Sequence, residues 1–183
     1  MVLGDSLSAA YGISVEQGWV TLLQDALPNY KVVNASISGE TTSGGKQRLP
    51  TLMKQHAPSV LVVELGANDA LRGQNLNATK QNLQTILNAC LEAESTCKPV
   101  LLGIRLPTNY GPAYDALLQK IYQDLAIENS VAFHPFFLEQ VALDPVLMQD
   151  DGLHPNALAQ PLILDAVLET LKSAEGLLAP ISP

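Results

Sequence analysis

The chain has 183 residues, 47% of them hydrophobic and 5% aromatic, which is enough for a single domain over residues 1–183 with a mainly aliphatic core. Its formal net charge of -8 argues against binding to nucleic acid or anionic lipid, because Lys and Arg are too few to neutralise phosphate groups. The sequence has no run of about 18 apolar residues and no charged segment followed by a long apolar one. Neither a membrane span nor a signal peptide is therefore predicted in it.

Short apolar runs alternate with segments of helical periodicity five times along the chain, without internal repeats. Strands are predicted at 1–3, 31–35, 59–65, 99–104 and 130–133. Helices are predicted at 19–27, 46–56, 77–93, 112–128 and 156–174, with Pro50 as a candidate kink and a loose tail at Pro180 and Pro183. This alternation predicts an α/β fold, a three-layer αβα sandwich around a flavodoxin-like parallel sheet of about five strands.

The first apolar run ends at Gly4, and Asp5, Ser6 and several small residues that could open a helix follow it. A serine at such a turn lies at the carboxyl edge of the sheet, where open α/β sheets bind ligands, and near a helix N-terminus that favours negative charge. Asp5 or Ser6 could instead serve only as an N-cap. Small polar groups follow the other apolar runs as well, which favours a functional role for Ser6: they are Gly39, Asn68, the 105–110 loop and the 151–154 loop.

Nucleophilic catalysis by serine needs a base, a partner that orients the base, and donors for the oxyanion. Of the three histidines, His154 is the best candidate for the base. His56 ends a predicted helix at the surface, and His134 follows the last strand and could be a packed structural histidine. Asp151 could orient His154 from one turn, with Asp150 as its rival, but Asp151 could instead be an acid at a helix N-terminus beside a surface histidine.

Three hydrogen-bond donors could form an oxyanion hole: the Ser6 N–H, the Gly39 N–H and the Asn68 side-chain amide. Gly39 could equally be part of a flexible loop, and Asn is often only a turn former. Apolar residues on the loops at the same edge could bind an acyl chain, or could belong to the core: Leu71, Leu106, Pro107, Tyr110 and Leu153. Because these loops are short, a shallow groove for short-to-medium acyl chains is predicted.

The two cysteines, Cys90 and Cys97, could form a disulfide or remain free thiols, and with three scattered histidines they form no zinc-like cluster. The segment 44–47 is similar to a phosphate-binding loop, but Glu40 and Gln47 occupy positions where that loop needs glycine and a hydroxyl residue. Nucleotide binding, or a non-catalytic flavodoxin-like module, is therefore a weak alternative.

Four blocks of the sequence resemble the SGNH-hydrolase (GDSL esterase) family and occur in the family's order: Gly4-Asp5-Ser6-Leu7-Ser8, Ser38-Gly39-Glu40-Thr41, Gly66-Ala67-Asn68-Asp69 and Asp151-Gly152-Leu153-His154-Pro155. Any one block is a weak signal, but four in register with the strand pattern are specific. The segments 64–73, 104–111 and 148–152 are also similar to the bacterial branch called thioesterase I/protease I/lysophospholipase, or arylesterase.

The resemblance implies a serine hydrolase of carboxylic esters and acyl thioesters, with Ser6 as nucleophile, His154 as base and Asp151 as its orienter. It assigns the oxyanion hole to Ser6, Gly39 and Asn68, and it implies no metal ion and no cofactor. A sugar-ester deacetylase is the main alternative. Small acyl esters or thioesters are the expected partners, and we expect a monomer. Members of the branch are usually periplasmic, with a signal that is cleaved.

Overall fold

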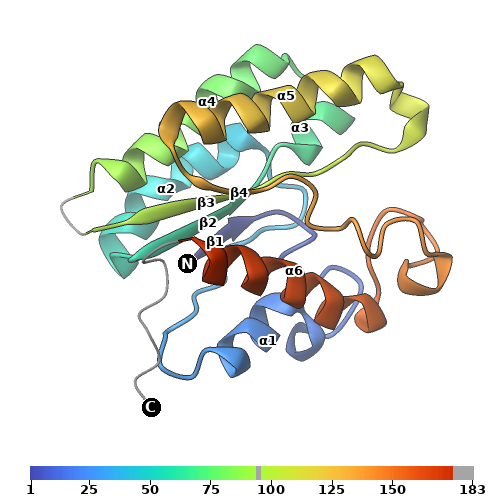
Figure 1. Cartoon of the computed structure of the whole chain (residues 1–183), viewed down its shortest axis with the longest axis horizontal. Helices are drawn as coiled ribbons and strands as arrows, with labels where there is room; N and C mark the ends of the chain where they lie inside the picture. Colours follow the sequence, from blue (N-terminus) through green and yellow to red (C-terminus); the bar gives the residue numbers. More distant parts are fainter. Residues whose placement is uncertain (94–95, 175–183) are drawn as a thin grey trace.

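The computed structural model describes residues 1–93 and 96–174, so the tail predicted at Pro180 and Pro183 lies outside the described residues. Its centre is a parallel sheet in the order β1 (Val2–Gly4), β2 (Val60–Glu64), β3 (Lys98–Leu102) and β4 (Ala132–His134) (Figure 1). Gly4 pairs with Glu64, and Leu102 pairs with His134. The carboxyl ends of these strands therefore share one edge of the sheet, and the predicted α/β class is confirmed.

The segment 31–35, predicted as a strand, is not a regular one. Asn34 makes an isolated parallel bridge with Val2 beside β1, and Val2 N–H donates to Val33 O at 2.8 Å. Ala35 N–H donates to Val2 O at 2.8 Å in the same bridge, so the backbone of this segment pairs with β1 over a very short stretch. The Asn34 side chain also bonds the backbone, because its amide donates to Ser8 O (2.8 Å) and its oxygen accepts from Ser36 N–H (3.1 Å). The sheet therefore has four strands rather than about five.

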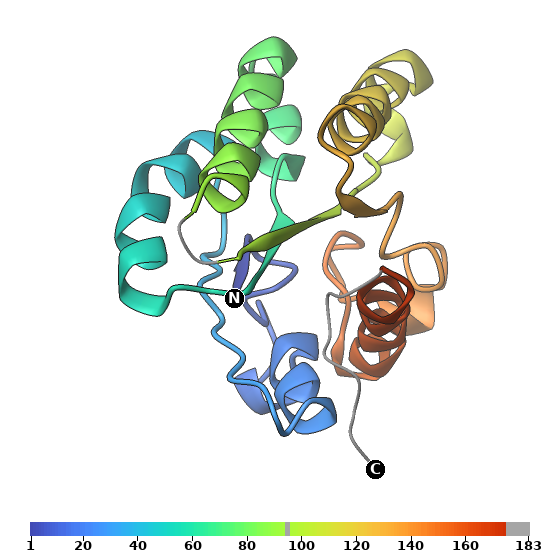
Figure 2. The ribbon, with the colours of Figure 1, turned by 60° about the vertical axis from the view of Figure 1, so that its left-hand side comes forward.

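Helices cover both faces of the sheet: α1 (Trp19–Ala26), α2 (Thr42–His56), α3 (Ala67–Leu71), α4 (Leu76–Leu91), α5 (Pro112–Asn129) and α6 (Gln160–Ser173). Figure 2 shows α2, α4 and α5 on one side of the sheet and α1 and α6 on the other. Short 3-10 helices are η1 (Val15–Gln17), η2 (Thr108–Tyr110), η3 (Pro145–Leu147) and η4 (Ala157–Ala159). Among the described residues, no helix has both the length and the apolar character that a membrane span needs.

The helix boundaries follow local capping more closely than hydrophobic periodicity. α2 begins at Thr42, four residues before the predicted start, because the Thr41 hydroxyl caps it by accepting from Gly44 N–H at 3.3 Å. Pro50 lies inside α2, which continues through it. α6 begins only at Gln160, because Asn156 caps the 3-10 turn that precedes it. α3 occupies a position where only a turn was predicted.

The core is aliphatic on both faces of the sheet, as the two long apolar runs predicted. Val63 and Leu101 are fully buried on one face of β2 and β3, and Val100 is fully buried on the other. Trp19 of α1 is also fully buried, and its indole N–H donates to Leu7 O at 3.1 Å. This bond ties α1 directly to the turn that carries Ser6.

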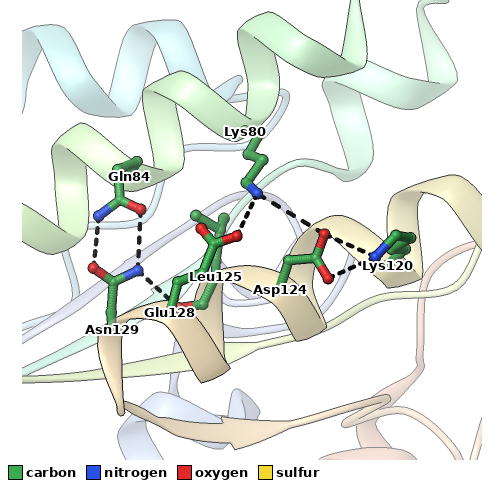
Figure 3. Close-up of polar contacts among 7 residues, drawn as sticks. All are labelled: Lys80, Gln84, Lys120, Asp124, Leu125, Glu128 and Asn129. Carbon is green, nitrogen blue, oxygen red and sulfur yellow. Dashed lines mark hydrogen bonds and ion pairs between the residues drawn. The ribbon is translucent and has the colours of Figure 1, made fainter.

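A polar seam joins α4 to α5 at the surface (Figure 3). The side-chain amides of Gln84 and Asn129 exchange two hydrogen bonds of 2.6 and 3.0 Å. Lys80 contacts Glu128 at 2.9 Å and Asp124 at 3.9 Å. Because exposed ion pairs contribute little to stability, the apolar contacts beneath this seam are the main support of the two helices.

Cys90 and Cys97 are joined by a disulfide, with their Cα atoms 5.1 Å apart. Of the two states that the sequence left open, the structure therefore has the bridged one. The bridge anchors the last turn of α4 to the start of β3.

Candidate active site

Ser6 lies in the turn that follows β1, at the carboxyl edge of the sheet. The helix expected to open there is absent, because residues 6–12 form consecutive turns. Ala9 N–H donates to Asp5 O at 3.0 Å, but Ala10 and Gly12 have positive φ angles of 58° and 75°, which interrupt helix formation. The Ser6 N–H therefore lies in a turn rather than at the N-terminus of a regular helix.

Ser6, His154 and Asp151 form one continuous hydrogen-bonded chain. The Ser6 Oγ lies 3.0 Å from His154 Nε2, and His154 Nδ1 lies 2.6 Å from Asp151 Oδ2. These contacts have the geometry that a serine nucleophile, its base and an orienting carboxylate require. His56 ends α2 and His134 ends β4, so His154 is the histidine that reaches Ser6.

The loop that carries Asp151 and His154 is preset by its own backbone. Asp151 Oδ1 accepts the N–H groups of Leu153 and His154, each at 2.9 Å, which leaves Oδ2 for the imidazole. Gly152 has a φ of 63°, and Gln149 N–H donates to His154 O at 2.8 Å to close the loop. A spacing of three residues therefore suits this pair, because one carboxylate both caps the turn and holds the ring.

The electrostatic setting of Asp151 keeps its carboxylate ionised. Partial burial raises its pKa, but the backbone N–H of His154, its imidazole and the N–H of Leu153 outweigh this effect and lower the pKa to about 2. Since the ordinary value is 3.8, these interactions stabilise the fold above that pH, and the contribution is lost as the pH falls through about 2. At neutral pH the ionised group can stabilise a protonated imidazole.

Asn68 lies in α3, and its side chain contacts Asp5 in the turn that carries Ser6. The preceding Gly66 has a φ of 120°, and a Cβ there would lie 2.5 Å from the Tyr122 hydroxyl, so only glycine allows α3 to begin at this point. Asn68 Nδ2 donates one hydrogen to Asp5 Oδ2 at 2.8 Å. Because a side-chain amide has two hydrogens, the second remains for a ligand.

Gly39 lines the same cavity as Ser6 and Asn68. It has a φ of 79°, and its carbonyl oxygen accepts from Arg72 Nη2 at 3.0 Å. The loop that carries Gly39 is tied to α3, because Thr42 N–H donates to Asp69 Oδ2 at 2.9 Å. The Gly39 loop and α3 therefore hold the two candidate oxyanion donors, the Gly39 N–H and the Asn68 side-chain amide, in a fixed relation to each other.

A cavity of about 740 Å³ opens beside Ser6 and His154. Four of the apolar residues predicted for the acyl chain line it: Leu71, Leu106, Pro107 and Leu153. Tyr110, the fifth, is not among the lining residues, and its hydroxyl donates to Leu71 O at 3.1 Å. Tyr110 therefore braces the loop that carries Leu71.

Two features of this cavity were not predicted from the sequence: a second apolar wall, and Tyr11, whose ring centroid lies 4.5 Å from that of His154. The wall comes largely from the segment after β4 and includes Phe136, Leu138, Ala142, Leu143 and Met148. The available signal was the apolar segment at 136–138, which follows the last strand and so begins at the same edge of the sheet. The predicted wall is too small, because the segment after β4 adds apolar residues to those of the predicted loops.

The segment that is similar to a phosphate-binding loop lies inside α2 instead of before it. Gly45 N–H already donates to Thr41 O at 2.9 Å, and the Glu40 carboxylate contacts Arg48 at 2.6 Å. A phosphate needs free N–H groups at a helix N-terminus, so this segment does not support nucleotide binding.

The fold, and the positions of the four sequence blocks that carry Ser6, Gly39, Asn68 and His154, are those of the SGNH hydrolases. The esterase AlinE4, described as a member of that family, matches 95% of this chain and 95% of its own chain, with a TM-score of 0.76 and 35% sequence identity. The model of the GDSL-like Lipase/Acylhydrolase family matches residues 2–160, and the chain belongs to this family.

Two curated relatives are similar over most of their length. Esterase TesA of Pseudomonas aeruginosa is 47% identical over 176 residues, which cover 94% of this chain and 87% of the relative. Thioesterase 1/protease 1/lysophospholipase L1 of Escherichia coli K12 is 48% identical over 173 residues, which cover 94% and 82%.

Two crystal structures are also similar at the level of the backbone. A structure of TesA has a TM-score of 0.91 and 45% identity, covering 97% of this chain and 98% of its own. The psychrotrophic esterase EstA from Pseudoalteromonas sp., inhibited by monoethylphosphonate, has a TM-score of 0.88 and 39% identity, covering 93% and 94%.

Proposed function

We propose that this protein is a serine hydrolase that cleaves carboxylic esters and acyl thioesters through an acyl-enzyme on Ser6. The observation that carries the proposal is the contact of 3.0 Å between Ser6 Oγ and His154 Nε2, continued at 2.6 Å to Asp151. This chain opens on a cavity with apolar walls, which suits an acyl group. The esterase, thioesterase and arylesterase names of relatives at 45–48% identity support the same activity.

In the first half of the reaction, Ser6 Oγ attacks the acyl carbonyl carbon while His154 Nε2 accepts the hydroxyl proton. The oxyanion lies between the N–H groups of Ser6 and Gly39 and the second amide hydrogen of Asn68. His154 then gives its proton to the leaving alkoxide or thiolate. In the second half, His154 takes a proton from water, which attacks the acyl-enzyme; the acyl–Oγ bond then breaks, His154 returns the proton to Ser6 Oγ, and the acid leaves. Asp151 stabilises the imidazolium that forms in each half.

The substrate class is tested with p-nitrophenyl esters of graded acyl length, an acyl thioester and an acetylated sugar, using the Ser6→Ala variant as the blank. We expect hydrolysis of the esters and the thioester, with no preference for the sugar ester. A kcat/KM on the acetylated sugar well above that on every simple ester would identify a sugar-ester deacetylase instead. No hydrolysis of any ester or thioester above the blank would refute the proposal.

The Asn68→Ala variant should lose roughly a hundredfold in kcat with little change in KM, because the amide binds the oxyanion best in the transition state. Steady-state kinetics on a short p-nitrophenyl ester measures both constants. Asn77→Ala, the same substitution at an exposed position of α4, is the matched control and should match the wild type. An effect of Asn68→Ala confined to KM would mean that this amide only binds substrate.

Phe136→Ser should lower kcat/KM on an octanoyl ester roughly tenfold more than on an acetyl ester. The reason is that each CH₂ buried against the cavity wall contributes about 0.8 kcal/mol, and the octanoyl chain has more CH₂ groups to bury than the acetyl group. Leu71→Ser, at another lining residue of the cavity, should show the same selectivity. Leu158→Ser is the control, since Leu158 is exposed and outside the cavity lining. Equal losses on both esters would show that the wall does not contact the acyl chain.

A further inference from the structure

Glu64, the last residue of β2, is a buried acid that the proposed reaction does not use. It is 1% exposed and lies against the turn of Ser6. Its Oε2 accepts the N–H of Asp5 at 3.1 Å and the hydroxyl of Ser8 at 2.8 Å. One carboxyl oxygen therefore holds the turn on both sides of Ser6. Gly4 makes this approach possible, because a Cβ there would lie 2.8 Å from Glu64 Oε2.

Asp5 extends this contact to the candidate oxyanion donor. Its Oδ1 accepts Leu7 N–H at 3.0 Å, and its Oδ2 accepts Asn68 Nδ2 at 2.8 Å. The carboxyl groups of Asp5 and Glu64 also lie close enough to influence each other's ionisation. A continuous chain thus runs from Glu64 through Asp5 to Asn68, with the turn of Ser6 attached to both acids.

Two carboxyl groups can hydrogen-bond to each other only if one of them keeps its proton. Both oxygens of Asp5 already accept N–H groups, which suits the ionised form. Glu64 receives both of its donors on Oε2, so its other oxygen can carry the proton and donate it to Asp5. The geometry therefore places the proton on Glu64.

The electrostatic surroundings agree with this assignment. Burial raises the pKa of Glu64 well above its ordinary value, and the adjacent charge of Asp5 raises it further. Burial also raises the pKa of Asp5, to about 6. The other titratable groups that face the pair are Asp69 of α3, Tyr122 of α5 and His154, and the pKa of Tyr122 is raised by burial and by the acids, so it stays neutral. Above about pH 6 the pair therefore holds one proton and one negative charge.

We propose that Glu64 is a positioning residue of this active site, which keeps its proton and, through Asp5, holds the Ser6 turn and the Asn68 amide in register. It touches neither the substrate nor the reacting atoms. Its effect arises because the oxyanion donors stabilise the transition state only when they are held in place before the reaction. The inference rests on the proposed function, since it assumes that Ser6 is the nucleophile.

Two substitutions at Glu64 separate positioning from simple loss of structure. In Glu64→Gln, the amide oxygen can accept the two existing bonds and the amide nitrogen can donate to Asp5, so kcat at neutral pH should stay within about threefold of the wild type. Glu64→Ala loses all three bonds, and kcat should fall roughly thirtyfold or more with KM nearly unchanged. The rate at which a phosphonate ester labels Ser6 should fall with kcat, and circular dichroism establishes that each variant is folded.

The proton itself is tested by the pH dependence of unfolding, which does not require Glu64→Ala to fold. Above its ordinary pKa of 4.5, Glu64 loses its proton in the unfolded chain, whereas the folded protein keeps the proton until the raised pKa is reached, so in that range this group lowers the free energy of unfolding as pH rises. Glu64→Gln cannot release this proton, so the slopes of wild type and variant should differ by about one proton, with the wild type losing more stability as pH rises. Glu128→Gln, the same change at an exposed residue of α5, is the control and should keep the wild-type slope.

Equal slopes in the wild type and Glu64→Gln would overturn the inference, as would a folded Glu64→Ala variant with wild-type kcat. A loss of kcat in Glu64→Gln as large as in Glu64→Ala would also overturn it. Each of these outcomes leaves the proposed function in place if Ser6→Ala is inactive. An active Ser6→Ala variant would refute the proposed function whatever the Glu64 variants show.

Discussion

Replacing Ser6 with alanine is expected to lower kcat by roughly three or more orders of magnitude while the fold is retained. The substitution removes the oxygen that we propose as the nucleophile, and water in its place lacks the positioning that the turn provides. The fold should survive because backbone bonds, Trp19 and Glu64 hold the turn independently of the Ser6 hydroxyl. Steady-state kinetics and a thermal melt measure the two halves of this prediction.

Two further measurements make the result specific. Ser43→Ala, which removes a hydroxyl at an exposed position of α2, should leave kcat unchanged. A phosphonate ester should add one adduct to the wild-type protein, located at Ser6 by peptide mapping, and none to Ser6→Ala. Wild-type activity in Ser6→Ala, or an adduct that maps to another residue, would refute the acyl-enzyme mechanism.

The Asp151→Asn variant is expected to lose on the order of a thousandfold in kcat, because an amide at this position would hold His154 in the wrong tautomer and could not stabilise the imidazolium. Asp150→Asn is a close control, since it removes the same charge one residue away and should change kcat by less than about threefold. Asp151 rather than Asp150 contacts His154 Nδ1, at 2.6 Å. Equal losses, or a larger loss at Asp150, would show that the orienting residue is wrongly assigned.

The pH dependence of kcat/KM in the wild type distinguishes the role of Asp151 from that of His154. The pKa of Asp151 is lowered to about 2, so its carboxylate stays ionised throughout the working range of the enzyme. We therefore expect no contribution of Asp151 to the acid limb, and kcat/KM should fall with decreasing pH because the imidazole gains a proton and can no longer accept one from Ser6. An acid limb that persists unchanged in a His154 variant with residual activity would contradict this assignment.

The local sequence pattern was sufficient to predict the elements whose formation depends mainly on hydrophobic burial. The apolar runs at 59–65 and 99–104 can only be buried strands, and the structure has β2 and β3 there. It was insufficient for short segments in which a few hydrogen bonds decide the outcome. The segment 31–35 pairs with β1 through a single bridge at Asn34, and the positive φ angles of Ala10 and Gly12 prevent a helix after Ser6. Neither effect changes the hydrophobic periodicity of the sequence, from which the elements were predicted.

The sequence by itself determined the class of this protein and the edge of the sheet where its polar groups meet. Ser6 and Asn68 each follow an apolar run, and parallel strands bring the ends of such runs together. Only the tertiary structure decided which carboxylate reaches His154, because spacings of three and four residues are equally possible in an irregular turn. It also decided that Phe136 completes the cavity and that Glu64 lies beneath Ser6. Those contacts join segments far apart in the chain, and the periodicity of either segment alone carries no information about its distant partner.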